Sequence, residues 1–217
     1  MDLLFEQEAY WDKVAETKDF PVPFNTELFQ KYVSKEKKVL EVGCGYGRVL
    51  DKLHNVDFKN LIGVDVSQRM INRGQRQYPY LSLRKSDGDV LPFPENVFHA
   101  VIFIAVLTCI SESEKQRNLM SEALRVLKND GILYVHDCML NQDTRNIERY
   151  EKYQEKYGEY GVFELPEGAV VRHHTEEHIF DITQEFEQIV FEQGTHTTMN
   201  GNRTNGFFYI GKKKNIS

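Results

Sequence analysis

Three glycines at alternate positions interrupt an apolar run early in the chain. Residues 39–50 read VLEVGCGYGRVL, with glycine at positions 43, 45 and 47. A strand that ends in alternate glycines before a helix lets a ligand approach the main chain, and the helix start offers free N–H donors to a negative group. Dinucleotide sites normally use GxGxxG, but Arg48 occupies the place of the third glycine. The segment therefore predicts a cofactor cradle that matches a dinucleotide site poorly.

A carboxylate follows these glycines at a spacing that suits a nucleoside. Asp65 lies in the apolar run LIGVDV, at residues 61–66, about twenty residues after the cradle. A carboxylate at the end of a second strand can accept hydrogen bonds from two ribose hydroxyls. We therefore expect Asp65 to bind a sugar.

Short apolar runs alternate with amphipathic ones along residues 37–138. The expected strands are continuous apolar runs, which indicates a parallel sheet covered on both faces. They cover residues 37–42, 61–66, 81–85, 100–110 and 131–139, and helix-like stretches lie between them. Residues 187–199 and 206–213 predict two final strands joined by the turn-rich NGNRTNG. We predict an α/β fold, a doubly wound, mostly parallel seven-stranded sheet with an antiparallel last strand and helices on both faces.

Two segments lie outside this alternation. We expect one domain over residues 1–217, with residues 1–36 forming an N-terminal helical cap. Residues 139–174 predict an inserted, helical or irregular lid after the fifth strand. Within it, RYEKYQEKYGEYG places Tyr150 and two further tyrosines on one side of a helix. A surface helix packing this aromatic stripe on the domain is favoured over a substrate lid.

The composition excludes several classes of protein. The chain has 41% hydrophobic and 28% charged residues and no apolar run of membrane-spanning length, and its start is acidic. We expect a cytoplasmic protein without a membrane partner. The net charge of −6 disfavours a nucleic-acid partner. Three widely spaced cysteines predict neither disulfides nor a zinc site.

The glycine segment and three later ones together resemble a known family. EVGCGYGR, GVDVS, SDGDVLPFPENVFHAV and EALRVLKNDGILYVHD follow one another in the order and spacing of class I, Rossmann-like S-adenosylmethionine-dependent methyltransferases of the small-molecule type. Tyr10 and Trp11 resemble an aromatic pair often met near the start of such chains. The similarity covers roughly residues 5–138 well. It implies S-adenosyl-L-methionine as cofactor and S-adenosyl-L-homocysteine as product.

The resemblance also implies the cofactor site. An aspartate before Leu-Pro-Phe would accept the adenine amine, and spacing favours Asp87 modestly over Asp89. Glu41 would lie beside the amino-acid portion of the cofactor. An equal alternative is that Glu41 is a strand-end carboxylate whose hydrogen bonds are made by nearby backbone. Met70 would lie on the adenine unless it is a core residue. The expected cofactor-binding residues are Tyr10, Trp11, Glu41, Gly43, Cys44, Gly45, Arg48, Asp65, Val66, Met70, Asp87, Gly88, Asp89 and Ile104.

No catalytic group follows clearly from the sequence. His136, near the end of the fifth strand, and His174, after the insertion, are weak candidates, and Tyr10 is a third. His99 stands where the family usually has an aspartate, and we expect it to be structural. We expect surface or pocket histidines, not a metal site. Tyr10, Trp11 and Tyr46 are candidates to face a cationic sulfur.

Methyl transfer from a sulfonium needs mainly positioning, because the cofactor carries the activated group. The resemblance favours a methyltransferase acting on a small molecule, as a monomer or homodimer. A nicotinamide-dependent oxidoreductase and a non-catalytic S-adenosylmethionine-binding subunit remain as alternatives.

Overall fold

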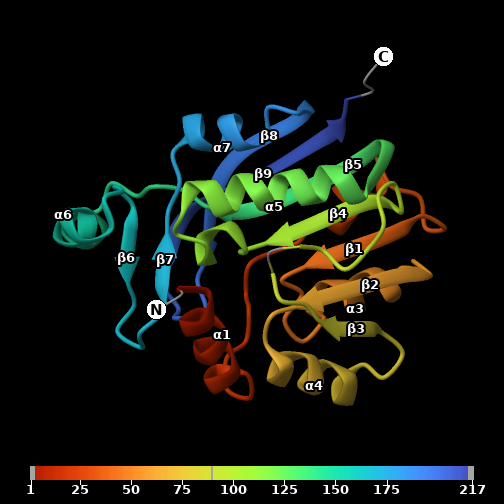
Figure 1. Ribbon diagram of the computed structural model, residues 1–217, viewed down its shortest axis with the longest axis horizontal. Helices are drawn as coiled ribbons and strands as arrows, with labels where there is room; N and C mark the ends of the chain where they lie inside the picture. The colour runs from red at the N-terminus through yellow and green to blue at the C-terminus, as the bar shows by residue number, and fades with distance from the viewer. Residues whose placement is uncertain (1–2, 89, 215–217) are drawn as a thin grey trace.

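The computed structural model describes residues 3–88 and 90–214. Its centre is one twisted sheet of seven strands in the order β3-β2-β1-β4-β5-β9-β8 (Figure 1). Strands β1 to β5 run parallel, and β9 is antiparallel to both of its neighbours. The predicted sheet and its antiparallel last strand are therefore confirmed. The strands are β1 (Lys38–Val42), β2 (Asn60–Asp65), β3 (Ser82–Lys85), β4 (Phe98–Ile104), β5 (Leu127–Cys138), β8 (Phe186–Thr197) and β9 (Arg203–Lys213).

Helices cover both faces of the sheet, which the alternation along β4 explains. Val101 and Phe103 pack on the side of α5 and α7, whereas Ala100 and Ile102 face α2 and α3. All four side chains are fully buried. This double burial is the physical reason that the strand is apolar throughout. The helices are α1 (Leu3–Val14), α2 (Thr26–Gln30), α3 (Arg48–His54), α4 (Gln68–Gln77), α5 (Ser113–Val126), α6 (Thr144–Tyr157) and α7 (Glu176–Ile182).

Two boundaries differ from those that the sequence predicts. The apolar run 100–110 leaves the sheet after Ile104, because Ala105 adopts a φ of 55° and a short 3-10 helix, η1 (Leu107–Cys109), follows. Helix α5 ends at Val126, not at Gly131, and β5 begins with the next residue. Hydrophobicity alone does not separate a buried strand from a buried turn, so neither boundary was readable.

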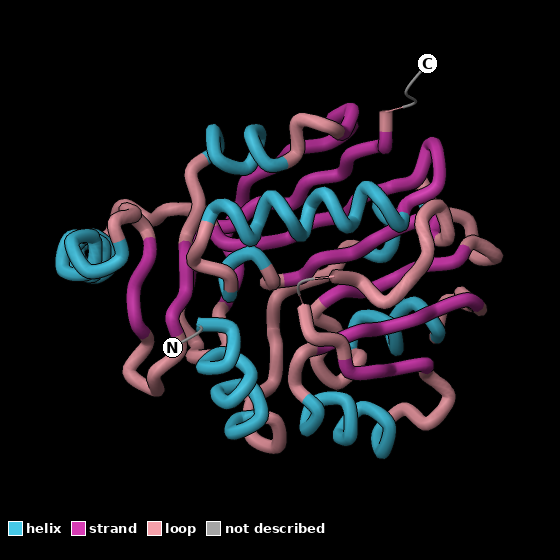
Figure 2. The backbone as a smooth tube through the Cα atoms, in the orientation of Figure 1, coloured by secondary structure: helices cyan, strands magenta, loops and turns pink. Residues whose placement is uncertain are grey.

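The insertion 139–174 forms a separate layer beyond the carboxyl ends of the parallel strands. It contains α6 and a small antiparallel pair, β6 (Val162–Glu164) and β7 (Val170–Arg172). Figure 2 shows this pair as two short strands between α6 and the main sheet, with α1 nearby. The Asp143 side chain caps α6, and Gly158, with a φ of 69°, ends it. The insertion thus places a wall opposite the sheet edge.

Candidate active site

A cavity of about 1120 Å³ lies between the sheet edge, α1 and the insertion. Its floor is formed where β1, β2 and β4 end, and its far wall comes from α6, β6, β7 and the β8–β9 loop. Ligands of open parallel sheets bind at this edge because the strand ends and helix starts meet there. Most of the predicted cofactor-binding residues and the insertion therefore face one space; Tyr10 does not line it, and Asp89 lies outside the described residues.

The glycine segment makes the tight turn from β1 into α3. Gly43 and Gly45 both adopt left-handed conformations, with φ values of 67° and 53°. A Cβ atom on Gly43 would lie 2.5 Å from Cγ2 of Val106, so no side chain fits there. Both glycines and Cys44 line the cavity. Bare backbone is thus exposed to any ligand on this turn, as the sequence predicts.

Asp65 at the end of β2 is held in place by two backbone donors. Its Oδ2 accepts a hydrogen bond of 2.7 Å from the Gly45 N–H, and Oδ1 accepts one of 2.8 Å from the Ser67 N–H. Burial raises the pKa of this carboxyl group to about 6. Each oxygen keeps a free lone pair, and the residue lines the cavity. Asp65 can therefore accept two further hydrogen bonds, as ribose hydroxyls require.

Glu41, near the end of β1, is a buried acid that also lines the cavity. Its side chain is 2% exposed, and its Oε2 has no hydrogen-bond partner among the described residues. Burial raises its pKa to about 8, although the nearby Arg48 guanidinium opposes the shift. A buried acceptor without a partner is costly, so a donor from a ligand would stabilise it. The ammonium group of S-adenosylmethionine fits this requirement.

Arg48 connects the turn to the N-terminal segment. Its Nη2 donates a hydrogen bond of 2.6 Å to the Val22 carbonyl, and its side chain lines the cavity. The loop around Val22 is thereby held beside the glycine turn. Arg48 is a cation available to the carboxylate of an amino-acid ligand.

The predicted adenine end is partly described. Asp87 is exposed at the cavity rim, and Gly88 beside it has a φ of 93°. Asp89 lies outside the described residues, so the choice between the two aspartates stays a prediction. Ser86 has a buried Oγ with no partner in the described part of the chain. Val66, Met70 and Ile104 also line the cavity.

Helix α1 is attached to the cofactor side of the cavity through Asp12. Its Oδ1 accepts hydrogen bonds of 2.6 Å from the Ser67 hydroxyl and 3.1 Å from the Arg69 N–H. Trp11 consequently lines the cavity. Tyr10 does not line the cavity, and its side chain is buried. Burial raises the pKa of its hydroxyl to about 12. Tyr10 is therefore not placed as a proton acceptor.

Tyr46 also points away from the cavity. Its ring stacks on Phe20 with centroids 5.7 Å apart, and the Arg73 guanidinium lies 3.9 Å from the ring centroid. Of the three aromatic residues predicted to face a sulfonium, the structure brings only Trp11 to the cavity wall.

The two candidate catalytic histidines lie outside the cavity wall. His136 lines a second, smaller pocket together with Tyr134 and does not line the cavity. Burial lowers its pKa to about 4. His174 is fully buried, its Nδ1 donates to the Cys138 carbonyl at 3.0 Å, and its Nε2 lies 3.0 Å from Nε2 of Gln116. Neither histidine is placed to act on a substrate, because neither lines the cavity. His99, at the far end of β4, accepts the Lys38 N–H, which is a structural role.

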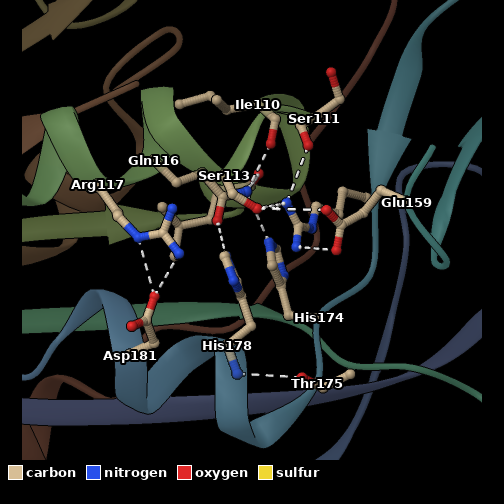
Figure 3. A network of polar contacts seen from close by, with 12 residues as sticks. Ile110, Ser111, Ser113, Gln116, Arg117, Glu159, His174, Thr175, His178 and Asp181 are labelled. Carbon is tan, nitrogen blue, oxygen red and sulfur yellow. Dashed lines mark hydrogen bonds and ion pairs between the residues drawn. The ribbon is translucent and has the colours of Figure 1, made fainter. Parts of the chain in front are cut away.

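His174 belongs to a network that fastens the insertion to the core (Figure 3). Arg172 is the buried cation of this network. Its Nη2 pairs with Glu159 at 2.8 Å, and its Nη1 donates hydrogen bonds to the Ser111 carbonyl and the Ser113 hydroxyl. Gln116 of α5 accepts a hydrogen bond from His178 of α7 at 2.7 Å. These contacts join the start of α5 to β7 and α7. They fix the cavity wall on which His173 stands.

Three polar residues of the far wall of the cavity were not predicted from the sequence. Arg149 and Arg145, four residues apart on α6, both line the cavity, and so does His173. Their spacing on one helix face is readable in the sequence. Their orientation toward the cavity is not, since it depends on how α6 packs on β6.

Two features are absent from the described part of the chain. Across residues 3–88 and 90–214, no group of three or more histidine, cysteine or acidic side chains is arranged to hold a metal ion. Within the same ranges, no helix has the length and apolar character to cross a bilayer.

The comparisons with known proteins agree with this geometry. The model of the Methyltransferase domain family matches residues 40–135, which span β1 to β5. An S-adenosylmethionine-dependent methyltransferase from Methanosarcina mazei has the same fold, with a TM-score of 0.83 and 21% identity over 88% of this chain and 99% of that one. Geranyl diphosphate C-methyltransferase from Streptomyces coelicolor, solved with S-adenosyl-L-homocysteine, gives a TM-score of 0.69 at 10% identity, covering 99% and 98% of the two chains.

Curated relatives match a shorter region. The eEF1A lysine and N-terminal methyltransferase of Mus musculus is 28% identical over 48% of this chain, and the match covers 16% of that protein. The mRNA cap guanine-N(7) methyltransferase of Eremothecium gossypii is 29% identical over 56% of this chain and 34% of its own length. The chain thus spans only part of these relatives. Residues 40–135 thus match the Methyltransferase domain family, and the whole chain shares the fold of S-adenosylmethionine-dependent methyltransferases of known structure.

Proposed function

We propose that this protein transfers a methyl group from S-adenosylmethionine to a small-molecule acceptor. The observation that supports the acceptor class is the extent of the cavity, which continues from the cofactor residues to the wall formed by α6, β6 and β7. Its volume of about 1120 Å³ exceeds the roughly 300–1000 Å³ of a typical ligand pocket. There is room for the cofactor and a second small ligand in one enclosed space.

The chain's own residues supply binding and orientation. Asp65 would hold the ribose, and Glu41 the ammonium group, while α1 and the insertion exclude water. The cofactor, when bound, supplies an activated methyl group on a sulfonium. Holding two reactants in near-attack geometry contributes about 7–11 kcal/mol to such a reaction. A base is needed only when the acceptor must lose a proton.

A binding experiment tests the cofactor site. We expect S-adenosylhomocysteine to bind with micromolar affinity and Asp65→Ala to weaken binding about 100-fold or more, because hydrogen bonds to a charged acceptor contribute about 1.5–3 kcal/mol each. Isothermal titration calorimetry measures this. Glu187→Ala, which removes an exposed acid on β8, is the matched control and should bind as the wild type does. Wild-type affinity in Asp65→Ala would refute the ribose assignment.

A transfer experiment tests the acceptor class. Labelled S-adenosylmethionine is incubated with the protein and with separate small-molecule, protein and RNA fractions of a cell extract. We expect label in the small-molecule fraction. Label in the protein or RNA fraction would contradict a small-molecule acceptor. It would indicate an acceptor of the kind named for the curated relatives. Binding without any label transfer would support a non-catalytic subunit.

A further inference from the structure

We propose that the acceptor is a small organic acid whose carboxylate is bound by Arg149. The inference rests on the proposed methyltransferase function and names its substrate class. It concerns the far wall of the cavity, formed by residues after β5, which the cofactor residues do not reach.

Arg149 stands in this wall without an anionic partner. Its guanidinium carbon lies 3.6 Å from the centroid of the Phe163 ring, which holds the side chain against β6. Its Nε is buried and has no hydrogen-bond partner within the described ranges. No ion pair joins it to a carboxylate of the described residues. Burial lowers the pKa of its guanidinium, although a hydrogen bond with the Tyr150 side chain and the nearby Asp143 carboxylate partly offset this effect. A partly buried cation in this state is stabilised by any oxyanion that reaches it.

Among the described residues, acidic side chains line only one end of the cavity, where Arg48, Lys85 and Lys115 also lie. Acidic side chains line it only from residues 8–122, and they come from α1, the β1–β3 strand ends and α5. From residue 139 onward the described charged lining residues are Arg145 and Arg149, besides the histidines. The acidic end suits a cofactor with a sulfonium and an ammonium group. The cationic end suits an acid, and it would repel a lysine side chain or another protonated amine.

His173 adds a neutral donor beside the arginine. Its Nδ1 lies 2.6 Å from the Tyr150 hydroxyl and 3.2 Å from Nδ2 of Asn141, whose Oδ1 is occupied by the Asn205 N–H. The Asn141 side-chain amide nitrogen is a donor, so Nδ1 of His173 is the acceptor in this contact. Because Nδ1 accepts, the ring proton is on Nε2. His173 lines the cavity and offers this N–H to a ligand oxygen.

The part of the far wall that comes from β6, β7 and the turn between them has an apolar surface. Phe163, Leu165 and Val171, from the β6–β7 pair and its turn, line the same space. An acid with an apolar body would therefore place the body on these side chains and its carboxylate on Arg149. A free inorganic anion would leave the apolar surface uncovered.

Calorimetry on the protein saturated with S-adenosylhomocysteine tests this proposal. The probes are 3-phenylpropanoate and its neutral counterpart 3-phenylpropanamide, with phenyl phosphate as a second oxyanion. We expect the carboxylate to bind at least about tenfold more tightly than the amide, as a charge-assisted hydrogen bond implies. Tighter binding of phenyl phosphate than of the carboxylate would reassign the anion to a phosphate and overturn the carboxylate proposal.

Three variants assign the preference to Arg149. Arg149→Gln should remove the preference for the acid, and Arg149→Lys should keep part of it. Arg69→Gln removes an exposed arginine outside the cavity and should change nothing. Unchanged S-adenosylhomocysteine affinity in all three shows that they are folded. An amide that binds as tightly as the acid, no acid binding at millimolar concentration, or an acid preference that survives in Arg149→Gln would overturn the proposal. Each of these results leaves the cofactor site intact, so it is distinct from a failure of the methyltransferase function.

Discussion

At the scale of single residues, the cofactor end of the cavity depends on two buried acids in different states. Asp65 accepts two backbone N–H groups, and its pKa rises only to about 6. Glu41 has an oxygen without a partner in the described structure, and its pKa rises to about 8. Near pH 7 Asp65 is therefore mostly ionised, whereas Glu41 is mostly protonated until a cation arrives.

This difference predicts proton release on cofactor binding. An ammonium group beside Glu41 favours the carboxylate, so S-adenosylhomocysteine should displace close to one proton at pH 7. Its own amino group is still protonated there. Calorimetry in two buffers of different ionisation enthalpy measures the release. Affinity should also fall as the pH is lowered from 7 to 6, by up to about tenfold.

Glu41→Gln supplies the comparison, because it keeps the shape of the side chain and cannot ionise. Its proton release on binding should be near zero. Equal release by Glu41→Gln and the wild type would show that another group, such as Asp65, is the source.

At the scale of elements, hydrogen bonds from Arg172 to the start of α5 hold the insertion in place as a wall of the cavity. Arg172 of β7 is 2% exposed and makes three hydrogen bonds, to Ser111, Ser113 and Glu159. Arg117 in the same network pairs with Asp181, but about half of each of these side chains is exposed (Figure 3). Buried charged hydrogen bonds contribute more than exposed ion pairs do.

Arg172→Met should therefore loosen the β6–β7 pair. Loss of about 1.5–3 kcal/mol of local stability corresponds to amide exchange roughly 10- to 150-fold faster in residues 162–172. Hydrogen exchange measured by mass spectrometry tests this, with residues 98–104 of β4 as the internal reference. Arg117→Met is the control and should change exchange by less than about fivefold. Equal exchange rates in the two variants would mean that apolar packing, not Arg172, holds the wall.

At the scale of the whole molecule, buried histidines make the fold sensitive to acid. His174 is a neutral ring between the Cys138 carbonyl and the Gln116 amide. Burial is the main reason that its pKa falls to about 3. The folded state thus binds fewer protons at this site than the unfolded state, where the value is near 6.5. Its contribution to stability is complete above pH 6.5 and is lost as the pH falls from there toward 3.

His174→Gln isolates this effect from the buried acids, whose raised pKa values act in the opposite direction. The difference in free energy of unfolding between the wild type and His174→Gln should be constant above pH 6.5. Below it, the difference should shift against the wild type by up to about 1.4 kcal/mol per pH unit. Urea denaturation at pH 7.5, 5.5 and 4.5 measures it. A difference that does not change with pH would contradict the neutral state of the ring.

The sequence by itself determined the sheet and the glycine turn after its first strand. Continuous apolar runs alternating with amphipathic ones require a doubly covered parallel sheet. Its topology then brings the glycine turn and Asp65 to one edge, and Gly45 and Asp65 are joined by a hydrogen bond. These features follow from local pattern and from rules of strand order.

Only the tertiary structure decided which side chains face the cavity. His136 and His174 lie near strand ends, which made them candidates, yet neither side chain lines the cavity. Arg149 and His173 carry no motif, and they meet only because α6 packs on β6 and β7. The physical reason is that side-chain direction at an inserted wall is set by long-range packing contacts, which hydrophobic periodicity does not encode.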